Sequence, residues 1–320
     1  MISGLVFRSM AKKSILVQYP YSHYAERYPR EECRFSCHRC SLCGYFYGNE
    51  NRESPALILV APGAGCPADG HLSEITYFVD HGWQVFSYDA TSLGKSEGKS
   101  VRGLPQAGRD LAAALACVAE EKDLPIVIYA HSAGAYAACR NLSKAPVLAA
   151  ACIAGFDLPT EIMFYHAKLH VGALSILGYP ALALRDFFAF GREGNRSAVK
   201  SINAVETPVL LYQDKADLVV PFEASLAGRK DRITNQNVRV AELSSGHSGA
   251  WLTERAGAYV RSVEKEYITL QKQYGGRLPE PVKESFLTSI DYERASEPNA
   301  AFLDGVLEFF RQETAKKALQ

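Results

Sequence analysis

The segment Ile126–Val–Ile–Tyr–Ala–His–Ser–Ala–Gly134 decides the fold, because an apolar run passes directly into a small-residue stretch that continues to Leu142. A serine between a strand and a helix, with small residues two positions away on either side, is the context of a nucleophile elbow, written G-x-S-x-G. Those positions are Ala130 and Gly134 here, and alanine is small enough for the backbones to pass closely. The other interpretation of Ser132 is a helix N-cap after a strand.

Further apolar runs on both sides of this segment read as strands. The strand candidates cover residues 57–61, 83–88, 126–130, 148–153, 209–212 and 238–243, and helical stretches cover 70–81, 108–122 and 132–142. Several candidates are apolar on successive residues, which is typical of strands covered on both faces. The alternation predicts an α/β fold with a mostly parallel, doubly wound sheet and right-handed crossovers.

Three other regions complete the predicted architecture. Residues 32–48 predict a β-hairpin that forms an antiparallel edge of the sheet. Residues 156–205 predict short amphipathic helices, which we interpret as a small helical cap inserted in the fold. Residues 250–320 predict a helical C-terminal extension that ends in an amphipathic helix. We expect residues 1–320 to form a single domain, because the chain length permits one large α/β unit.

The composition excludes some classes of partner. Lys plus Arg and Asp plus Glu both number 35, so the formal net charge is zero and nothing favours nucleic acid or an anionic membrane as a partner. No apolar run approaches the ~18 residues of a membrane span. Arg8, Lys12 and Lys13 interrupt the apolar core that a signal peptide would need. We therefore expect a cytoplasmic protein with no membrane span.

A glycine-rich turn, Ala61–Pro–Gly–Ala–Gly65, follows the first parallel strand candidate. Such a turn can direct a backbone N–H toward a carbonyl oxygen. Together with the N–H of Ala133 at the start of the helix after Ser132, the N–H of Ala64 would form an oxyanion hole. The alternative is a plain strand-to-helix turn.

The segment Ser87–Tyr–Asp–Ala–Thr–Ser–Leu–Gly–Lys–Ser–Glu–Gly98 lies between this turn and the elbow. At this point the sequence resembles the α/β-hydrolase superfamily, in its lipase/esterase and serine-aminopeptidase-like branch. The resemblance implies an α/β-hydrolase fold. It also implies that Asp89 and Ser96 shape the loop rather than take part in chemistry.

The resemblance also indicates a candidate acid and base. The segment 210–221 is similar to the family segment in which a strand-end Asp precedes a short apolar stretch and Pro, which implies Asp217 as the acid. Asp214 and Asp157 are its rivals. His247 lies in a small-residue loop after the last strand candidate, in the expected order of Ser, Asp, His. His131 more plausibly supports the elbow than acts as the base.

Ser132, Asp217 and His247 together imply a serine hydrolase that forms an acyl-enzyme without a cofactor or metal. The expected substrate is a small-molecule ester or a peptide-like compound. A peptidase or amidase with the same triad is one alternative, with Glu161 and Glu193 available for a substrate amine. A non-catalytic binding protein, a cofactor-free haloperoxidase and a C–C bond hydrolase are others, because a fold does not set the chemistry.

Aromatic residues of the insertion suggest what the substrate carries. They are Phe164, Tyr165, Tyr179, Phe187, Phe188 and Phe190. Some must pack the insertion onto the core, and others are candidates to line an apolar acyl pocket. Arg185 and Asp186 are candidates to bind a polar end instead.

Four cysteines cluster at Cys33, Cys37, Cys40 and Cys43. Four thiolates can hold a structural zinc ion, and Cys33 with Cys43 could pair across the hairpin. However, strand–turn–strand geometry points alternate side chains to opposite faces, so inert free thiols are the favoured interpretation and no metal site is predicted.

Overall fold

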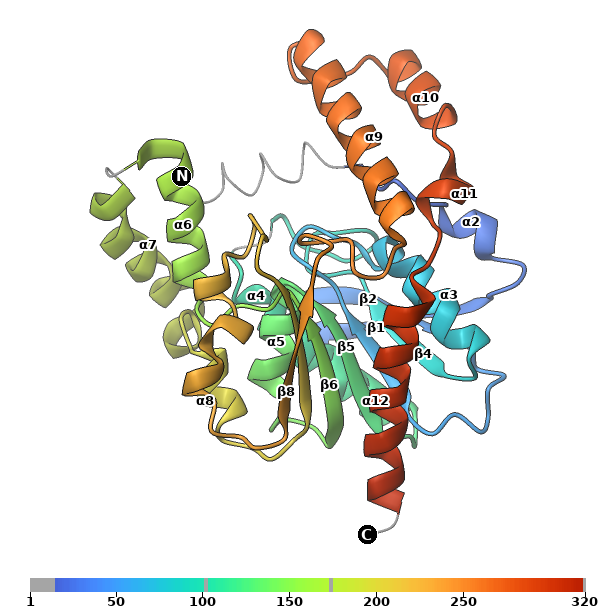
Figure 1. Ribbon diagram of the computed structural model, residues 1–320, viewed down its shortest axis with the longest axis vertical. Helices are drawn as coiled ribbons and strands as arrows, with labels where there is room; N and C mark the ends of the chain where they lie inside the picture. Colours follow the sequence, from blue (N-terminus) through green and yellow to red (C-terminus); the bar gives the residue numbers. More distant parts are fainter. Residues whose placement is uncertain (1–14, 101–102, 173–174, 319–320) are drawn as a thin grey trace.

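The computed structural model describes residues 15–100, 103–172 and 175–318. Its centre is an eight-stranded sheet in the order β1-β2-β4-β3-β5-β6-β7-β8 (Figure 1). The strands are β1 Arg30–Cys37, β2 Cys40–Tyr47, β3 Leu57–Ala61, β4 Gln84–Tyr88, β5 Ile126–His131, β6 Val147–Ile153, β7 Val209–Asp214 and β8 Val238–Leu243. The strands from β4 across to β8 run parallel, and β2 pairs antiparallel with β1 and β4. The predicted mostly parallel sheet with an antiparallel hairpin edge is therefore confirmed.

Helices cover both faces of the sheet. The helices are α2 Tyr21–Tyr24, α3 Leu72–Asp80, α4 Gln106–Glu121, α5 Ala133–Asn141, α6 Pro159–Val171, α7 Ser175–Phe190, α8 Ala198–Ile202, α9 Glu254–Gln273, α10 Glu280–Thr288, α11 Tyr292–Ala295 and α12 Ala300–Ala318. Successive residues of a strand point to opposite faces. On β3, Leu57 and Leu59 join the core under α4 and α5, whereas Ile58 and Val60 join the core under α3 and α12. Burial on both faces explains why these strands are apolar on successive residues.

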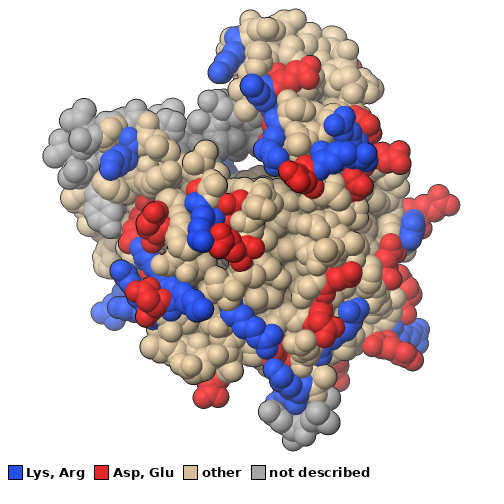
Figure 2. Space-filling view, viewed as in Figure 1, with Lys and Arg blue, Asp and Glu red and all other residues tan. Residues whose placement is uncertain are grey.

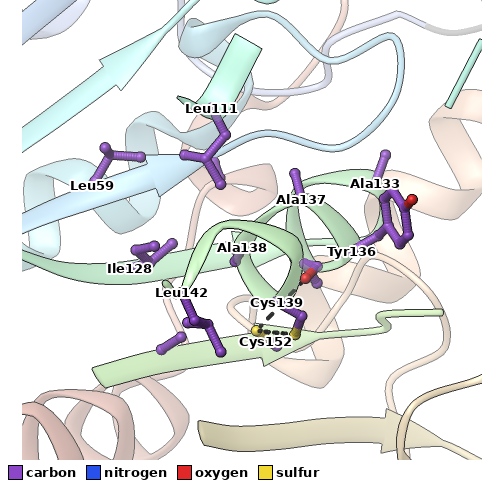
Figure 3. Packing of buried hydrophobic residues seen from close by; sticks show 14 of the residues in the cluster. Leu59, Leu111, Ile128, Ala133, Tyr136, Ala137, Ala138, Cys139, Leu142 and Cys152 are labelled. Atoms are coloured by element: carbon purple, nitrogen blue, oxygen red, sulfur yellow. Dashed lines mark hydrogen bonds between the residues drawn. The ribbon is translucent and has the colours of Figure 1, made fainter. Parts of the chain in front are cut away.

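The helix that follows the predicted elbow lies deep in the first of these cores. Ala137 and Ala138 of α5 are fully buried, and the larger side chains around them include Leu59, Leu111 and Ile128 (Figure 3). Small side chains allow α5 to approach the sheet closely. This close packing fixes the N-terminus of α5, where Ser132 precedes the helix.

Two groups of helices, one formed by α6 and α7 and the other by α9, α10 and α11, lie at one end of the sheet (Figure 1). α6, α7 and α8 lie between β6 and β7 in the sequence, within the expected insertion 156–205. α9, α10 and α11 form a separate apolar cluster of their own, with Val17 from the N-terminal segment and Tyr267 and Phe286 among its members. The last helix, α12, packs against one face of the sheet. It is the amphipathic helix that was expected at the end of the C-terminal extension.

Basic and acidic side chains are interspersed on the face seen in Figure 2. Within the described ranges, no helix is long and apolar enough to cross a membrane. Arg8, Lys12 and Lys13, which carry the expectation about a signal peptide, lie outside the described residues.

Candidate active site

Ser132 lies in a sharp, strained turn between β5 and α5. Its φ is 53° and its ψ is −114°, a region that residues with a side chain rarely adopt. Two residues on, a Cβ at Gly134 would lie only 2.1 Å from the carbonyl oxygen of Ala61. The α5 backbone can therefore pass the end of β3 only because residue 134 is glycine. The strained φ and ψ at a position fixed by packing are what a nucleophile elbow requires.

The structure brings Ser132, Asp217 and His247 together in one hydrogen-bonded chain. His247 Nε2 lies 3.0 Å from Ser132 Oγ, and His247 Nδ1 lies 2.8 Å from Asp217 Oδ2. With Nδ1–H donating to the carboxylate, Nε2 is left to accept the serine proton. The three residues come from the ends of β5, β7 and β8, which lie at the same edge of the parallel sheet.

Asp217 is held as a carboxylate by four donors. Its Oδ1 accepts the N–H groups of Val219 at 2.7 Å and Val220 at 2.9 Å, and its Oδ2 also accepts the Gln213 amide at 3.2 Å. Burial would raise the pKa of Asp217, but the His247 hydrogen bond and these backbone donors outweigh it and hold the pKa below its ordinary value. Asp217 therefore carries the negative charge that would stabilise a protonated His247.

The two rival carboxylates are engaged elsewhere. Asp214 accepts the N–H of Ala216 at 2.7 Å and that of Gly246 at 2.6 Å, so it ties the end of β7 to the loop that carries His247. Asp157 pairs with Arg229 at 2.6 Å. Neither carboxylate is hydrogen-bonded to His247.

The loop after β4 is organised by the two residues that the resemblance indicated. Asp89 accepts hydrogen bonds from the N–H of Ala68, the N–H of Lys95 and the hydroxyl of Tyr45. Ser96 donates its hydroxyl to the Asp89 carbonyl at 2.6 Å. Asp89 thus connects this loop to the turn that precedes α3, and Ser96, which also accepts the N–H of Cys43, connects it to β2.

The glycine-rich turn lies beside the serine. A Cβ at Gly63 would lie 3.5 Å from Ser132 Cβ and 2.9 Å from His131 Nδ1. Ala64 is exposed and lines the same pocket as Ser132. Among the hydrogen bonds of the described residues, none uses the N–H of Ala64 or of Ala133. Neither N–H group is bound to an acceptor in the described part of the chain, and their role in an oxyanion hole stays a prediction.

The pocket above Ser132 has a cavity volume of about 340 Å³ and mostly apolar walls. Its apolar lining residues include Leu104, Phe156, Ile162, Met163, Val220 and Trp251. Sequence reasoning missed this set, because the contributing residues are scattered over five segments. The α6 contribution, Ile162 and Met163, was hidden among many apolar residues of the insertion.

The aromatic candidates of the insertion whose side chains are described do not line this pocket, so for them the expectation is wrong. Phe187 and Phe188 are 54% and 78% exposed, and Phe190 is buried beneath Arg109. Phe164 and Tyr165 are also absent from the lining, and the side chain of Tyr179 lies outside the described residues. Helix α6 lines the pocket with Ile162, Met163 and His166 and not with Phe164 or Tyr165.

The charged candidates of the insertion do not line the pocket either. Asp186 is buried and pairs with Arg185 at 3.0 Å. Glu161 pairs with Arg229, and Glu193 pairs with Arg140 and Arg196. The carboxylate that does line the pocket, among the described residues, is Glu264 of α9.

His131 is hydrogen-bonded to the loop that carries His247. Its Nε2 lies 2.9 Å from the His247 carbonyl oxygen, to which it donates, and its ring contacts Trp251 edge-on. Burial, followed by the nearby His247 and His71, lowers the pKa of His131 well below its ordinary value. A neutral His131 therefore holds the His247 loop in place without competing for the proton of Ser132.

The four clustered cysteines point to different neighbours. Cys33 faces Cys117, with 3.9 Å between the sulfurs, and Cys37 contacts Asp110 at 3.4 Å. Cys43 is buried, and Cys40 is half-buried opposite Cys37 across the hairpin turn. This divergence follows from the strand–turn–strand geometry.

Comparison with known proteins adds a family match. Residues 52–158, which include the glycine-rich turn, the Asp89 loop and the elbow, match the serine aminopeptidase, S33 family (Hydrolase_4). A search among curated proteins gave no match.

Several solved structures share the fold. The esterase Pf2001 of Pyrococcus furiosus aligns with a TM-score of 0.58 and 16% identity, over 81% of this chain and 94% of that one. An acylaminoacyl peptidase of Pyrococcus horikoshii aligns at 0.53 and 17% identity, over 77% of this chain and 42% of that one. Est1E of Butyrivibrio proteoclasticus, solved with ferulic acid bound, aligns at 0.51 and 14% identity, over 77% and 100%. The sheet, its connectivity and these structural alignments give the chain the fold of the α/β hydrolases.

Proposed function

We propose that this protein is a serine hydrolase that cleaves a carboxylic ester with an apolar acyl group, using Ser132, His247 and Asp217 as its catalytic triad. The observation that carries the proposal is the continuous chain of hydrogen bonds from Asp217 through His247 to Ser132 at the floor of an apolar pocket. In this proposal the chain is one hydrolase domain, and the insertion 156–205 is a cap whose helix α6 supplies one wall of the substrate pocket.

The proposed reaction follows from the roles of these groups. His247 Nε2 takes the proton of Ser132 as Oγ attacks the ester carbonyl, and then delivers it to the leaving alcohol. The N–H groups of Ala64 and Ala133 hold the oxyanion, a contribution worth about 3 kcal/mol for each donor. Water then attacks the acyl-enzyme by the same route, with His247 again as the base.

Hydrolysis of p-nitrophenyl esters from acetyl to dodecanoyl tests the proposal. The wild type should hydrolyse the short and medium acyl esters, with a preference set by the limited cavity volume. Ser132→Ala should lose at least about 10³-fold in kcat/KM while keeping the circular dichroism spectrum of the wild type. Equal turnover by both proteins would contradict the role of Ser132.

A peptidase with the same triad is the second candidate, and one observation favours it. Glu264 lines the pocket from α9 and forms no ion pair with any described residue. A carboxylate at that place is a candidate to bind a substrate amine. Aminoacyl p-nitroanilides distinguish the two functions: an aminopeptidase should cleave them in preference to the esters, and Glu264→Gln should raise its KM for them by about tenfold.

A further inference from the structure

The pocket wall holds a thiol that the proposed hydrolysis does not use. Cys66 is half-buried and ends the turn that carries Ala64; its N–H donates to the Gly63 carbonyl at 3.2 Å. Its sulfur rests against Gly70, where an added Cβ would lie 2.1 Å from Sγ. Among the described residues, Cys66 is the one cysteine that lines this pocket.

His71, one member of a buried histidine–glutamate pair, lines the same pocket as this sulfur. His71 and Glu74 are 1% and 0% exposed, and His71 Nδ1 lies 2.7 Å from Glu74 Oε1. The other ring nitrogen, Nε2, is buried without a hydrogen-bond partner, as is Glu74 Oε2. A buried polar atom that lacks a partner costs about 1–3 kcal/mol, so such a group in a pocket wall is a functional candidate.

The surroundings of His71 favour its charged form. Burial lowers the pKa of His71, but Glu74 first and Cys66 second outweigh burial and raise it to about 10. The Nε2–H group of the charged ring is a donor without a partner in the same wall as the sulfur. Reactive cysteines lie in such electropositive, partly exposed surroundings, whereas structural thiols are buried and inert.

We propose that Cys66 is a site of covalent modification by soft electrophiles, disulfides in particular, with the His71–Glu74 pair as its activating group. The Cys66 sulfur attacks one sulfur of a disulfide RSSR, an S–S bond to Cys66 forms, and the S–S bond of the reagent breaks to release RS⁻. His71 Nε2–H donates a hydrogen bond to the attacking sulfur. The thiol proton ends on the released RSH, so that Cys66–SH and RSSR give Cys66–SSR and RSH.

The adduct would occupy the substrate pocket and displace the turn that carries Ala64. This consequence rests on the proposed hydrolase function, whereas the reactivity of Cys66 does not. Modification should therefore stop ester hydrolysis, and reduction with dithiothreitol should restore it.

The probe is 5,5′-dithiobis(2-nitrobenzoate) at limiting concentration on the full chain, with peptide mass spectrometry to measure the rate at each cysteine. Cys40 is the matched control, because it is also half-buried but lies at the hairpin turn away from the pair. We expect Cys66 to react at least about tenfold faster than Cys40. His71→Gln should slow the reaction at Cys66 by about tenfold and leave the rate at Cys40 unchanged, and Glu74→Gln should act in the same direction.

The outcomes separate the inference from the proposed function. Labelling rates need no turnover and can be repeated in Ser132→Ala, so an inactive enzyme does not affect them. After treatment with the reagent, Cys66→Ala should hydrolyse esters at the same rate as before treatment. The wild type should lose its ester hydrolysis. Equal reactivity of Cys66 and Cys40 in the wild type would overturn the inference even if the buried variants failed to fold. Unchanged labelling rates at Cys66 in folded His71→Gln and Glu74→Gln would also overturn the inference. Equal loss of ester hydrolysis in treated wild type and treated Cys66→Ala would do the same.

Discussion

Two aspartates at the end of β7 differ in what their carboxylates touch. Asp214 binds backbone N–H groups of its own loop and of Gly246, whereas Asp217 binds backbone N–H groups and the imidazole of His247. Only Asp217 can fix the tautomer of His247 and stabilise its protonated form. Asp214 can affect catalysis only through the position of the loop.

Substitution of each aspartate by asparagine separates these roles. Asp217→Asn should lower kcat by about 10³- to 10⁴-fold with little change in KM, because the wrong tautomer of His247 would face Ser132. Asp214→Asn loses one backbone hydrogen bond, so it should lower the free energy of unfolding by about 1–2 kcal/mol and kcat far less. Steady-state kinetics and urea denaturation of both variants provide the comparison. A larger kcat loss in Asp214→Asn would contradict the assignment of the acid.

At the residue scale, the sequence indicates functional residues where a local pattern surrounds them. Ser132 and His247 lie in short small-residue segments after apolar runs, and the structure places their side chains 3.0 Å apart. No local pattern surrounds His71 and Glu74, because a histidine and a glutamate three positions apart can occur at the start of any helix. Its importance depends on complete burial, which only the tertiary structure reveals.

At the scale of elements, the elbow depends on how closely α5 passes β3. The Cβ position of Gly134 lies 2.1 Å from the Ala61 carbonyl oxygen, and backbone atoms cannot move aside as a flexible side chain can. Any side chain there must displace the first turn of α5 from the sheet. That displacement would move Ser132 relative to His247.

Gly134→Ala tests this close approach. It should lower the free energy of unfolding by about 2–4 kcal/mol and reduce ester hydrolysis in the folded fraction. The matched control is Gly178→Ala in α7, where nothing lies within 4 Å of the added Cβ. In a helix interior this change should raise stability by about 0.5–1 kcal/mol. Thermal and urea denaturation measure both, and equal effects would rule out the steric explanation.

Strands were predicted more reliably than the helices around the pocket. β3 is an apolar run buried on both faces, and it begins and ends where expected. β8, whose residues are half-buried or exposed, also begins and ends where expected. The expectation for the extension 250–320 did not include what its helices pack on. α9, α10 and α11 share an apolar cluster with Val17, while Ala256 at the start of α9 joins the core on one face of the sheet. A helix pattern reports which face is buried but not against which partner, so the contribution of α9 to the pocket could not be predicted.

At the scale of the whole molecule, the buried His71–Glu74 pair makes stability depend on pH. The pair lies at the start of α3, between the sheet core and the pocket, and neither side chain contacts solvent. Its hydrogen bond joins His71, which directly precedes α3, to Glu74 in the first turn of that helix. Loss of the proton from His71 would leave Glu74 as a buried, unpaired charge, which would lower the free energy of unfolding of the whole protein.

The sign of the effect follows from the pKa of His71, which rises from 6.5 to about 10 on folding. Below pH 6.5 both the folded and the unfolded protein carry the proton, so the stabilisation is fully present. Between pH 6.5 and 10 the unfolded protein loses the proton first, and the stabilisation is progressively lost. The free energy of unfolding should therefore fall by up to about 5 kcal/mol over this range.

Urea denaturation of wild type, His71→Gln and Glu74→Gln between pH 6 and about pH 10 measures this contribution. Both variants should be less stable than the wild type at pH 6, because each leaves one partner buried without the other. Their stability should fall less with rising pH, since the shifted titration of His71 is absent. The wild-type and variant curves should therefore converge toward pH 10. Parallel curves across the range would show that His71 is neutral in the folded protein at pH 6.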